Sequence, residues 1–218
     1  MSSITGLSDA QTLELYRVAL ENAIANTIIA EALAELGYEQ QIIDEGKEKL
    51  AHARSAFELN NIEDDESAQA YQEFDTLKEE IKEAYSLHRK KGKVVFRKDD
   101  LVLNQLELSG AAPKAYIKWL ETVKKFYTTV KNTQAIQDKL QRLKITINDV
   151  DNLLGKISQL EAARSKYLIE KGESQEATQT KDTAIAQIDD WMSEFYAVAR
   201  IALEDKPQLL EALGKVVR

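Results

Sequence analysis

Apolar residues recur along most of this chain at intervals of three and four, which places them on one face of an α-helix. The seam is clearest between residues 43 and 57, where the spacings are 3, 4, 3 and 4: Ile43, Gly46, Leu50, Ala53 and Phe57. Such a seam is typical of helices that pack along one another. The pattern predicts an all-α protein, a helical bundle with coiled-coil packing.

The same pattern predicts six long helices and two short ones, after a short tail at residues 1–7. Only 8 Gly and 2 Pro interrupt the chain, and this scarcity favours long elements. The long helices are expected at about 8–36, 39–59, 66–89, 113–143, 146–171 and from 173 onward, and the short ones at about 99–108 and 207–214.

Local signals support several of these boundaries. Ser8 with Gln11, and Thr146 with Asp149, have the spacing of a capping box, in which each side chain bonds a backbone N–H at the helix start. Residues 60–66, which include four acidic side chains, predict a turn.

Three glycines add to this picture. Gly37 is suited to end the first helix in a left-handed conformation. Gly172 predicts a turn. Gly46 lies on the apolar seam, where glycine costs about 1 kcal/mol of helix propensity relative to alanine. We therefore expect a neighbouring backbone to approach Gly46 closely.

Motifs of the first half return in the same order in the second. Ala53-Arg54-Ser55 recurs as Ala163-Arg164-Ser165, and Leu106-Glu107 recurs as Leu210-Glu211. We infer a tandem duplication of a three-helix unit. Residues 1–110 form the first repeat and residues 111–218 the second, and the two repeats could build one compact domain.

The matches require shifts of between 104 and 111 residues. A shift of 111 makes Leu77 and Ile188 equivalent seam positions. The differences between the shifts predict about seven extra residues in the first repeat, within the basic stretch that follows His88.

Composition narrows the class of protein. The chain is 44% hydrophobic and 30% charged, holds no cysteine and carries a formal net charge of −8. Absence of cysteine excludes disulfides and thiolate metal sites. The negative charge makes nucleic-acid binding unlikely for the surface as a whole. No signal peptide and no membrane span are expected, and we predict a cytoplasmic protein.

Motifs of catalysis are not found. The two histidines, His52 and His88, lie in no metal-binding pattern, and the sequence lacks a Gly-rich phosphate loop and a nucleophile motif. We expect no enzymatic activity, no catalytic residue, no cofactor and no metal. Arg54 and Arg164 could form two related anion sites, or each could bond a carboxylate or helix-end carbonyls between helices.

A basic segment is the best candidate for a binding site. It contains six cationic residues: Arg89, Lys90, Lys91, Lys93, Arg97 and Lys98. Such a cluster can contact phosphate, an anionic lipid headgroup or an acidic protein. The alternative is a solvated hairpin or helix extension that balances acidic neighbours.

Self-association is expected from the first helix, whose apolar face is wider than one pair of neighbouring helices needs. Such surplus apolar area is covered either by the other half or by another copy of the chain. Ile24 and Ile28 are the candidate contacts for a homo-oligomer.

The stretch from Trp191 to Gly214 resembles the C-terminus of a group of uncharacterised bacterial all-helical proteins, through Trp191-Met192-Ser193-Glu194-Phe195-Tyr196 and Pro207-Gln208-Leu209-Leu210-Glu211. The resemblance implies a bacterial, cytoplasmic protein and no particular activity.

Three functions remain open. The first is a structural or protein-interaction bundle that self-associates. The second is a regulatory binding module that uses residues 89–98 on an anionic partner. The third is a bundle that binds a small molecule.

Overall fold

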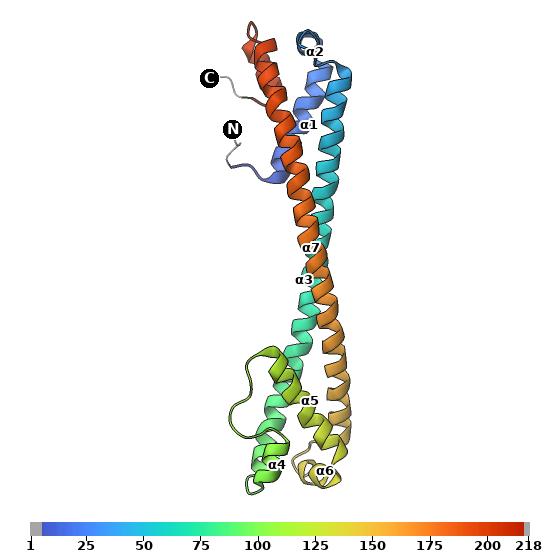
Figure 1. Ribbon diagram of the computed structural model, residues 1–218, viewed down its shortest axis with the longest axis vertical. Coiled ribbons are helices and arrows are strands. Elements are labelled where there is room, and N and C mark those ends of the chain that lie inside the picture. The colour runs from blue at the N-terminus through green and yellow to red at the C-terminus, as the bar shows by residue number, and fades with distance from the viewer. Residues whose placement is uncertain (1–5, 216–218) are drawn as a thin grey trace. The chain divides into compact units, whose positions relative to one another are not determined.

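The computed structural model describes residues 6–215, and within them the protein is all α-helical, as predicted (Figure 1). Most of the predicted tail, residues 1–5, lies outside the described range. The elements, in order, are α1 (Asp9–Ala25), α2 (Thr27–Ala34), α3 (Gln40–Val95), α4 (Asp100–Gln105), α5 (Tyr116–Asn132), α6 (Gln134–Gln141), α7 (Ile147–Ala202) and the 3-10 helix η1 (Pro207–Leu213).

The first predicted helix is two helices, because Asn26 interrupts it. Asn26 has an extended backbone, and its side-chain oxygen accepts hydrogen bonds from the N–H groups of Ile28 and Ile29. It therefore ends α1 and starts α2. Thr133, also extended, divides α5 from α6 at the equivalent position, without a capping hydrogen bond from its side chain.

The turns predicted at residues 60–66 and at Gly172 are wrong, because α3 and α7 each run unbroken for 56 residues. Neither glycine nor proline occurs between residues 60 and 66, and Asn60 donates to Asp64 one turn further on. A single glycine costs about 1 kcal/mol in a helix interior, too little to end a helix that is packed on both sides of it. Both capping boxes are confirmed.

The chain forms two compact units, and neither is a contiguous half. Unit 1 contains residues 1–65 and 172–218, and unit 2 contains residues 66–171. The boundaries fall inside α3 and α7. The predicted repeats, 1–110 and 111–218, are therefore not the compact units, since each repeat contributes helices to both.

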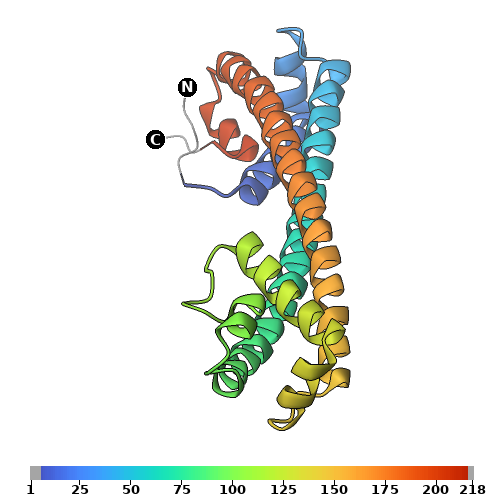
Figure 2. The ribbon, with the colours of Figure 1, turned by 60° about the horizontal axis from the view of Figure 1, so that its bottom comes forward.

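The two units are assembled from corresponding parts. In unit 1, α1, α2 and the start of α3 from the first repeat pack with the end of α7 and η1 from the second (Figure 1). In unit 2, α5, α6 and the start of α7 pack with the end of α3 and α4 (Figure 2). The two long helices run antiparallel within each unit.

Each unit has its own apolar core. Leu20, Ile29 and Leu33 from the first repeat meet Ile188 and Phe195 from the second in unit 1. The core of unit 2 is also made by both repeats and includes Ile81, Phe96, Phe126, Tyr127 and Leu140. No helix in the described range 6–215 has an apolar stretch long enough to cross a bilayer.

The repetition of elements is regular. Asp9 and Tyr116 begin α1 and α5, and Gln40 and Ile147 begin α3 and α7; each pair is separated by 107 positions. The matched helices have equal lengths of 17, 8 and 56 residues. Positive φ angles recur at the same separation, at Gly37 with Lys144 and at Glu107 with Gly214. These matches support the inferred duplication.

The constant separation contradicts the predicted insertion of seven residues: the basic segment has a counterpart of equal length in the second repeat. It also changes the pairing of positions. Ile188 corresponds to Ile81 instead of Leu77. Arg54 and Arg164 do not correspond; Arg54 bonds Glu14 at 2.7 Å, and Arg164 lies over the ring of Tyr116 at 4.4 Å.

Side-chain sizes have diverged in a compensating way. A methyl group on Gly46 would lie 2.5 Å from the Trp191 ring, so the space above Gly46 is filled by a side chain and not by the predicted backbone. The equivalent positions in unit 2 hold Leu153 and Ala84, a large residue in place of the glycine and a small one in place of the tryptophan. The combined volume is thereby roughly maintained, which cores tolerate well.

We predict that cutting the chain between the repeats leaves both units folded, because each unit's core contains helices from both sides of the cut. A protease site inserted between the exposed residues Ala111 and Ala112 provides the cut. After cleavage, the two fragments should co-elute in gel filtration and keep the helical circular dichroism of the intact chain. Separation of the fragments as folded species would contradict the shared cores.

The equivalence of Ile81 and Ile188 gives a second prediction. Both are fully buried, so Ile81→Ala and Ile188→Ala should each lower the free energy of unfolding of the affected unit by about 2–5 kcal/mol. Leu77→Ala, at a half-buried position, should cost less. Urea melts followed by circular dichroism measure all three, and a neutral effect at only one isoleucine would break the equivalence.

Candidate interaction surfaces

The basic segment occupies the end of α3 and the turn before α4. Lys90, Lys93, Arg97 and Lys98 are exposed, and Lys91 is half-buried. None of these five cations forms an ion pair with a carboxylate in the described part of the chain. The segment is therefore a helix extension as far as Val95, one of the two forms considered in the alternative, but acidic neighbours in the described residues do not neutralise its exposed cations.

Arg89 differs from the rest of the segment because it is buried, with 7% of its surface exposed. Its guanidinium donates hydrogen bonds to the carbonyl oxygens of Glu107, Leu108 and Gly110 and to the hydroxyl of Tyr85. Arg89 thus fixes to α3 the segment between α4 and α5, residues 106–115, which we call the connector. Arg89 is therefore not part of the exposed cationic surface on which the predicted partner contact depends.

A neighbouring cation assists this fastening. Lys93 donates to the carbonyl of Gly110 at 2.9 Å. In unit 1 the position equivalent to Arg89 is Tyr196, whose hydroxyl donates to the carbonyl of Leu213. Both residues bond carbonyls at the end of the short helix or just beyond it, so this contact is common to the two units.

Apolar side chains accompany the exposed cations. Leu87 and Val94 are 52% and 57% exposed and share one face of α3 with Lys90. Arg97 and Lys98 follow this face in the chain. We call these five residues the basic surface: Leu87, Lys90, Val94, Arg97 and Lys98.

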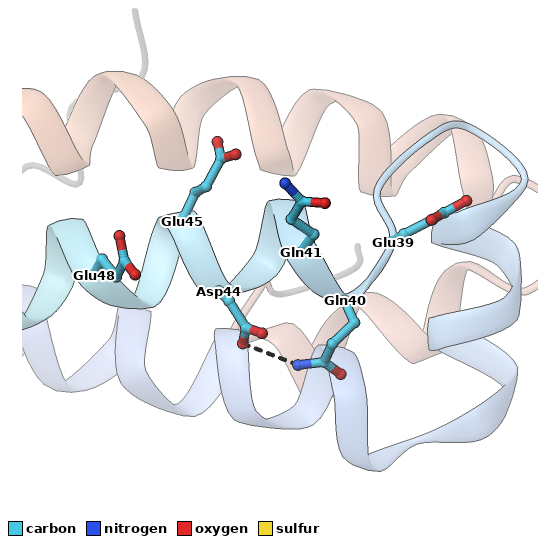
Figure 3. A pocket seen from close by; sticks show the side chains of 6 residues that line it. All are labelled: Glu39, Gln40, Gln41, Asp44, Glu45 and Glu48. Carbon is cyan, nitrogen blue, oxygen red and sulfur yellow. Dashed lines mark hydrogen bonds between the residues drawn. The ribbon is translucent and has the colours of Figure 1, made fainter.

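An acidic group lies at the start of α3, in unit 1. Figure 3 shows the side chains that line an open depression of about 550 Å³, and each of them is exposed. Its four carboxylates form no ion pair within residues 6–215, and only Asp44 has a hydrogen-bond partner drawn, Gln40 at 2.9 Å. We call these four residues the acidic surface: Glu39, Asp44, Glu45 and Glu48.

Charge is divided unequally between the units. Unit 1 has 9 Lys and Arg against 22 Asp and Glu, and unit 2 has 20 against 15. The formal net charges are therefore −13 and +5, which make up the −8 of the whole chain. The sequence prediction considered only the total, which conceals this separation.

The two predicted self-association residues differ in exposure. Ile24 is half-buried and packs against the core of unit 1, so it belongs to the fold of a single chain. Ile28 is 45% exposed on α2 and stays a candidate contact.

The two histidines have different surroundings. His52 is exposed, whereas His88 is buried in unit 2, with its Nδ1 atom 3.0 Å from the hydroxyl of Tyr127. Burial, reinforced by the nearby charge of Lys91 and opposed by that of Asp149, lowers the pKa of His88. Phe195 occupies the equivalent position in unit 1 and is fully buried, so a ring is needed there and a titratable one is not.

Comparisons with known proteins add nothing to this description: no family model, no curated protein and no solved structure matches the chain.

The buried histidine predicts a dependence on pH. The unfolded chain takes up a proton at His88 below about pH 6.5, whereas the folded state, with its lowered pKa, resists protonation. Unit 2 should therefore lose stability as the pH falls below that value. His88→Phe should reduce the loss, measured by urea melts at about pH 7.5 and about pH 5.5. His52→Phe is the matched control, and equal acid sensitivity in His88→Phe and the unchanged protein would refute the assignment.

Proposed function

We propose that the protein is a structural or interaction protein that self-associates head to tail, with the basic surface of one copy on the acidic surface of the next. The observation that carries this proposal is the separation of charge, −13 in unit 1 and +5 in unit 2. Opposite charges on two surfaces of one chain attract a second copy in a defined orientation.

The exposed groups are suited to such a contact. The cations of the basic surface and the carboxylates of the acidic surface are free of ion pairs within the described residues, so binding breaks no existing pair. Leu87 and Val94 add apolar area to the basic side, and Leu36, 46% exposed just before the acidic surface, adds it to the other. Apolar area supplies affinity, and charge supplies orientation.

Two different patches form this contact, so the interface is heterologous. A heterologous interface leaves one free surface at each end of a growing assembly, which then closes into a ring or continues. A symmetric dimer would instead bury the same patch on both copies.

A regulatory module that binds a different anionic partner is the second candidate, supported by the same unpaired cations at residues 90–98. In that function the acidic surface has no role. Reversing the charges of the acidic surface therefore distinguishes the two proposals.

The test uses two charge-reversal variants. The basic-surface variant carries Lys90→Glu and Arg97→Glu, and the acidic-surface variant carries Glu45→Lys and Glu48→Lys. Light scattering at low salt should give a mass above that of one chain for the unchanged protein. The mass should fall towards that of one chain in about 1 M NaCl, where the Debye length is only about 3 Å and charge attraction is screened. Each variant alone should be monomeric.

Mixing the variants is the decisive step. In the mixture, the reversed surface of one variant should attract the reversed surface of the other, because their charges are again opposite. The two surfaces left unchanged should also attract each other. The mixture should therefore recover the association that each variant lacks alone. Matched controls reverse exposed charges outside the two surfaces: Lys118→Glu in unit 2, and Glu173→Lys with Glu176→Lys in unit 1. These controls should associate as the unchanged protein does.

Two results would contradict the proposal. One is the mass of a single chain for the unchanged protein at low salt and at all concentrations. The other is undiminished association in both variants. Loss of association in Ile28→Lys, with both charge-reversal variants unaffected, would favour the predicted apolar contact through α2.

A further inference from the structure

Unit 2 contains a cavity between α3, the connector and the start of α5, separate from the basic surface. Its volume is about 470 Å³, within the range of roughly 300–1,000 Å³ that small-molecule sites occupy. Eleven residues line it, and none of them belongs to the basic surface, although Tyr85, Ser86 and Arg89 are near neighbours of that surface on α3. The connector contributes Ala112, Pro113 and Lys114.

Aromatic rings form much of the wall. Tyr85, Tyr116 and Trp119 all line the cavity. Tyr116 is held by contacts away from the cavity: its ring meets Phe74 edge-on with centroids 5.5 Å apart, and the Arg164 guanidinium lies 4.4 Å from its centroid. Because such contacts fix the orientation of the ring, it offers a preformed surface for a flat apolar group.

Cationic side chains line the cavity together with these rings. Lys78, Lys82, Arg89 and Lys114 line the cavity together with a single carboxylate, Glu79. Glu79 pairs with Lys82 at 2.7 Å, and Lys78 pairs with Asp75 at 2.8 Å. Lys114 forms no ion pair within the described residues, and the groups that Arg89 bonds, three carbonyl oxygens and the Tyr85 hydroxyl, carry no charge. The lining therefore has an excess of positive charge.

Comparison of the two units shows that the shared fold does not require the lysines of the lining, whereas Arg89 has a structural role. The positions equivalent to Lys78, Lys82 and Arg89 hold Ile185, Asp189 and Tyr196 in unit 1. Tyr116 and Trp119 are likewise replaced, by Asp9 and Thr12. The same helices thus pack in unit 1 without Lys78, Lys82, Tyr116 and Trp119, so the packing that the two units share does not depend on these four side chains.

We infer that this cavity binds a small organic anion with a flat aromatic body, an aryl carboxylate in its simplest form. The carboxylate lies towards Lys82 and Lys114, and the ring lies against Tyr116 and Trp119. Lys82 and Lys114 are exposed, so each adds a modest attraction for the carboxylate that solvent screens. This site is independent of the head-to-tail contact, since its residues are not those of the basic surface.

The probe is 2-naphthoate, added to the full-length protein and followed by isothermal titration calorimetry. Three comparison compounds separate the contributions: 2-naphthamide lacks the charge, cyclohexanecarboxylate lacks the aromatic ring, and inorganic phosphate lacks the apolar body. We expect 2-naphthoate to bind at least about tenfold more tightly than each of them, a difference of about 1.4 kcal/mol.

Variants locate the site. Lys82→Gln with Lys114→Gln should weaken 2-naphthoate binding about fivefold or more. Ser86→Trp should abolish it, because Ser86 lines the cavity at an exposed point of α3 and a larger side chain fills the space. Lys118→Gln with Lys166→Gln removes two exposed cations of unit 2 outside the cavity and should leave binding unchanged. Helical circular dichroism confirms that each variant is folded.

Several outcomes would overturn the inference. These are no binding of 2-naphthoate, equal binding of 2-naphthamide or of phosphate, and unchanged binding in the folded Ser86→Trp variant. The charge-reversal experiment on self-association uses residues outside this cavity, so either proposal can fail while the other holds.

Discussion

Neither repeat of this protein can bury its apolar residues without the other. α1, α2 and the start of α3 present Leu20, Ile29 and Ile43 to a core that the end of α7 completes with Ile188 and Phe195. In unit 2 the roles are exchanged: α5, α6 and the start of α7 from the second repeat form most of the core, and the end of α3 from the first repeat completes it. An unpaired repeat would leave two partial cores open to water, where each large apolar side chain forfeits about 1.5–3 kcal/mol of burial. Pairing of the repeats is therefore the condition for both folded units.

The sequence was informative where the signals are local. Periodicity predicted the helical class, and the capping boxes at Ser8 and Thr146 predicted two helix starts. It was misleading at residues 60–66, where acidic residues resemble the start of a new helix although nothing there prevents the old one from continuing. Asn26 was missed for the opposite reason. Its side chain can end one helix and cap the next, and an apolar surrounding sequence hides that capacity.

Long-range features were beyond single-sequence reasoning for a physical reason. Motif matching aligned Arg54 with Arg164. Residues of the same type need not occupy equivalent positions, because facing positions in the two units have exchanged large and small side chains. The correct separation emerges only from helix boundaries and from the paired left-handed residues. The cavity of unit 2 was missed as well, because α3, the connector and α5 come together only in the fold. Cationic residues on α3 were the one signal available, and Arg89 among them was assigned to the surface.

The pairing of Gly46 with Trp191 has a consequence for the history of the chain. Suppose that two copies of the first repeat joined: Ala84 would then face Gly46, and two small residues would leave a hole. Two copies of the second repeat would place Trp191 against Leu153, which is too crowded. Only the unlike combination fills both sites. If the two repeats derive from a single ancestral unit, that unit would have had to pair with an identical copy of itself. The present repeats instead fill both sites only as an unlike pair, so neither could now replace the other.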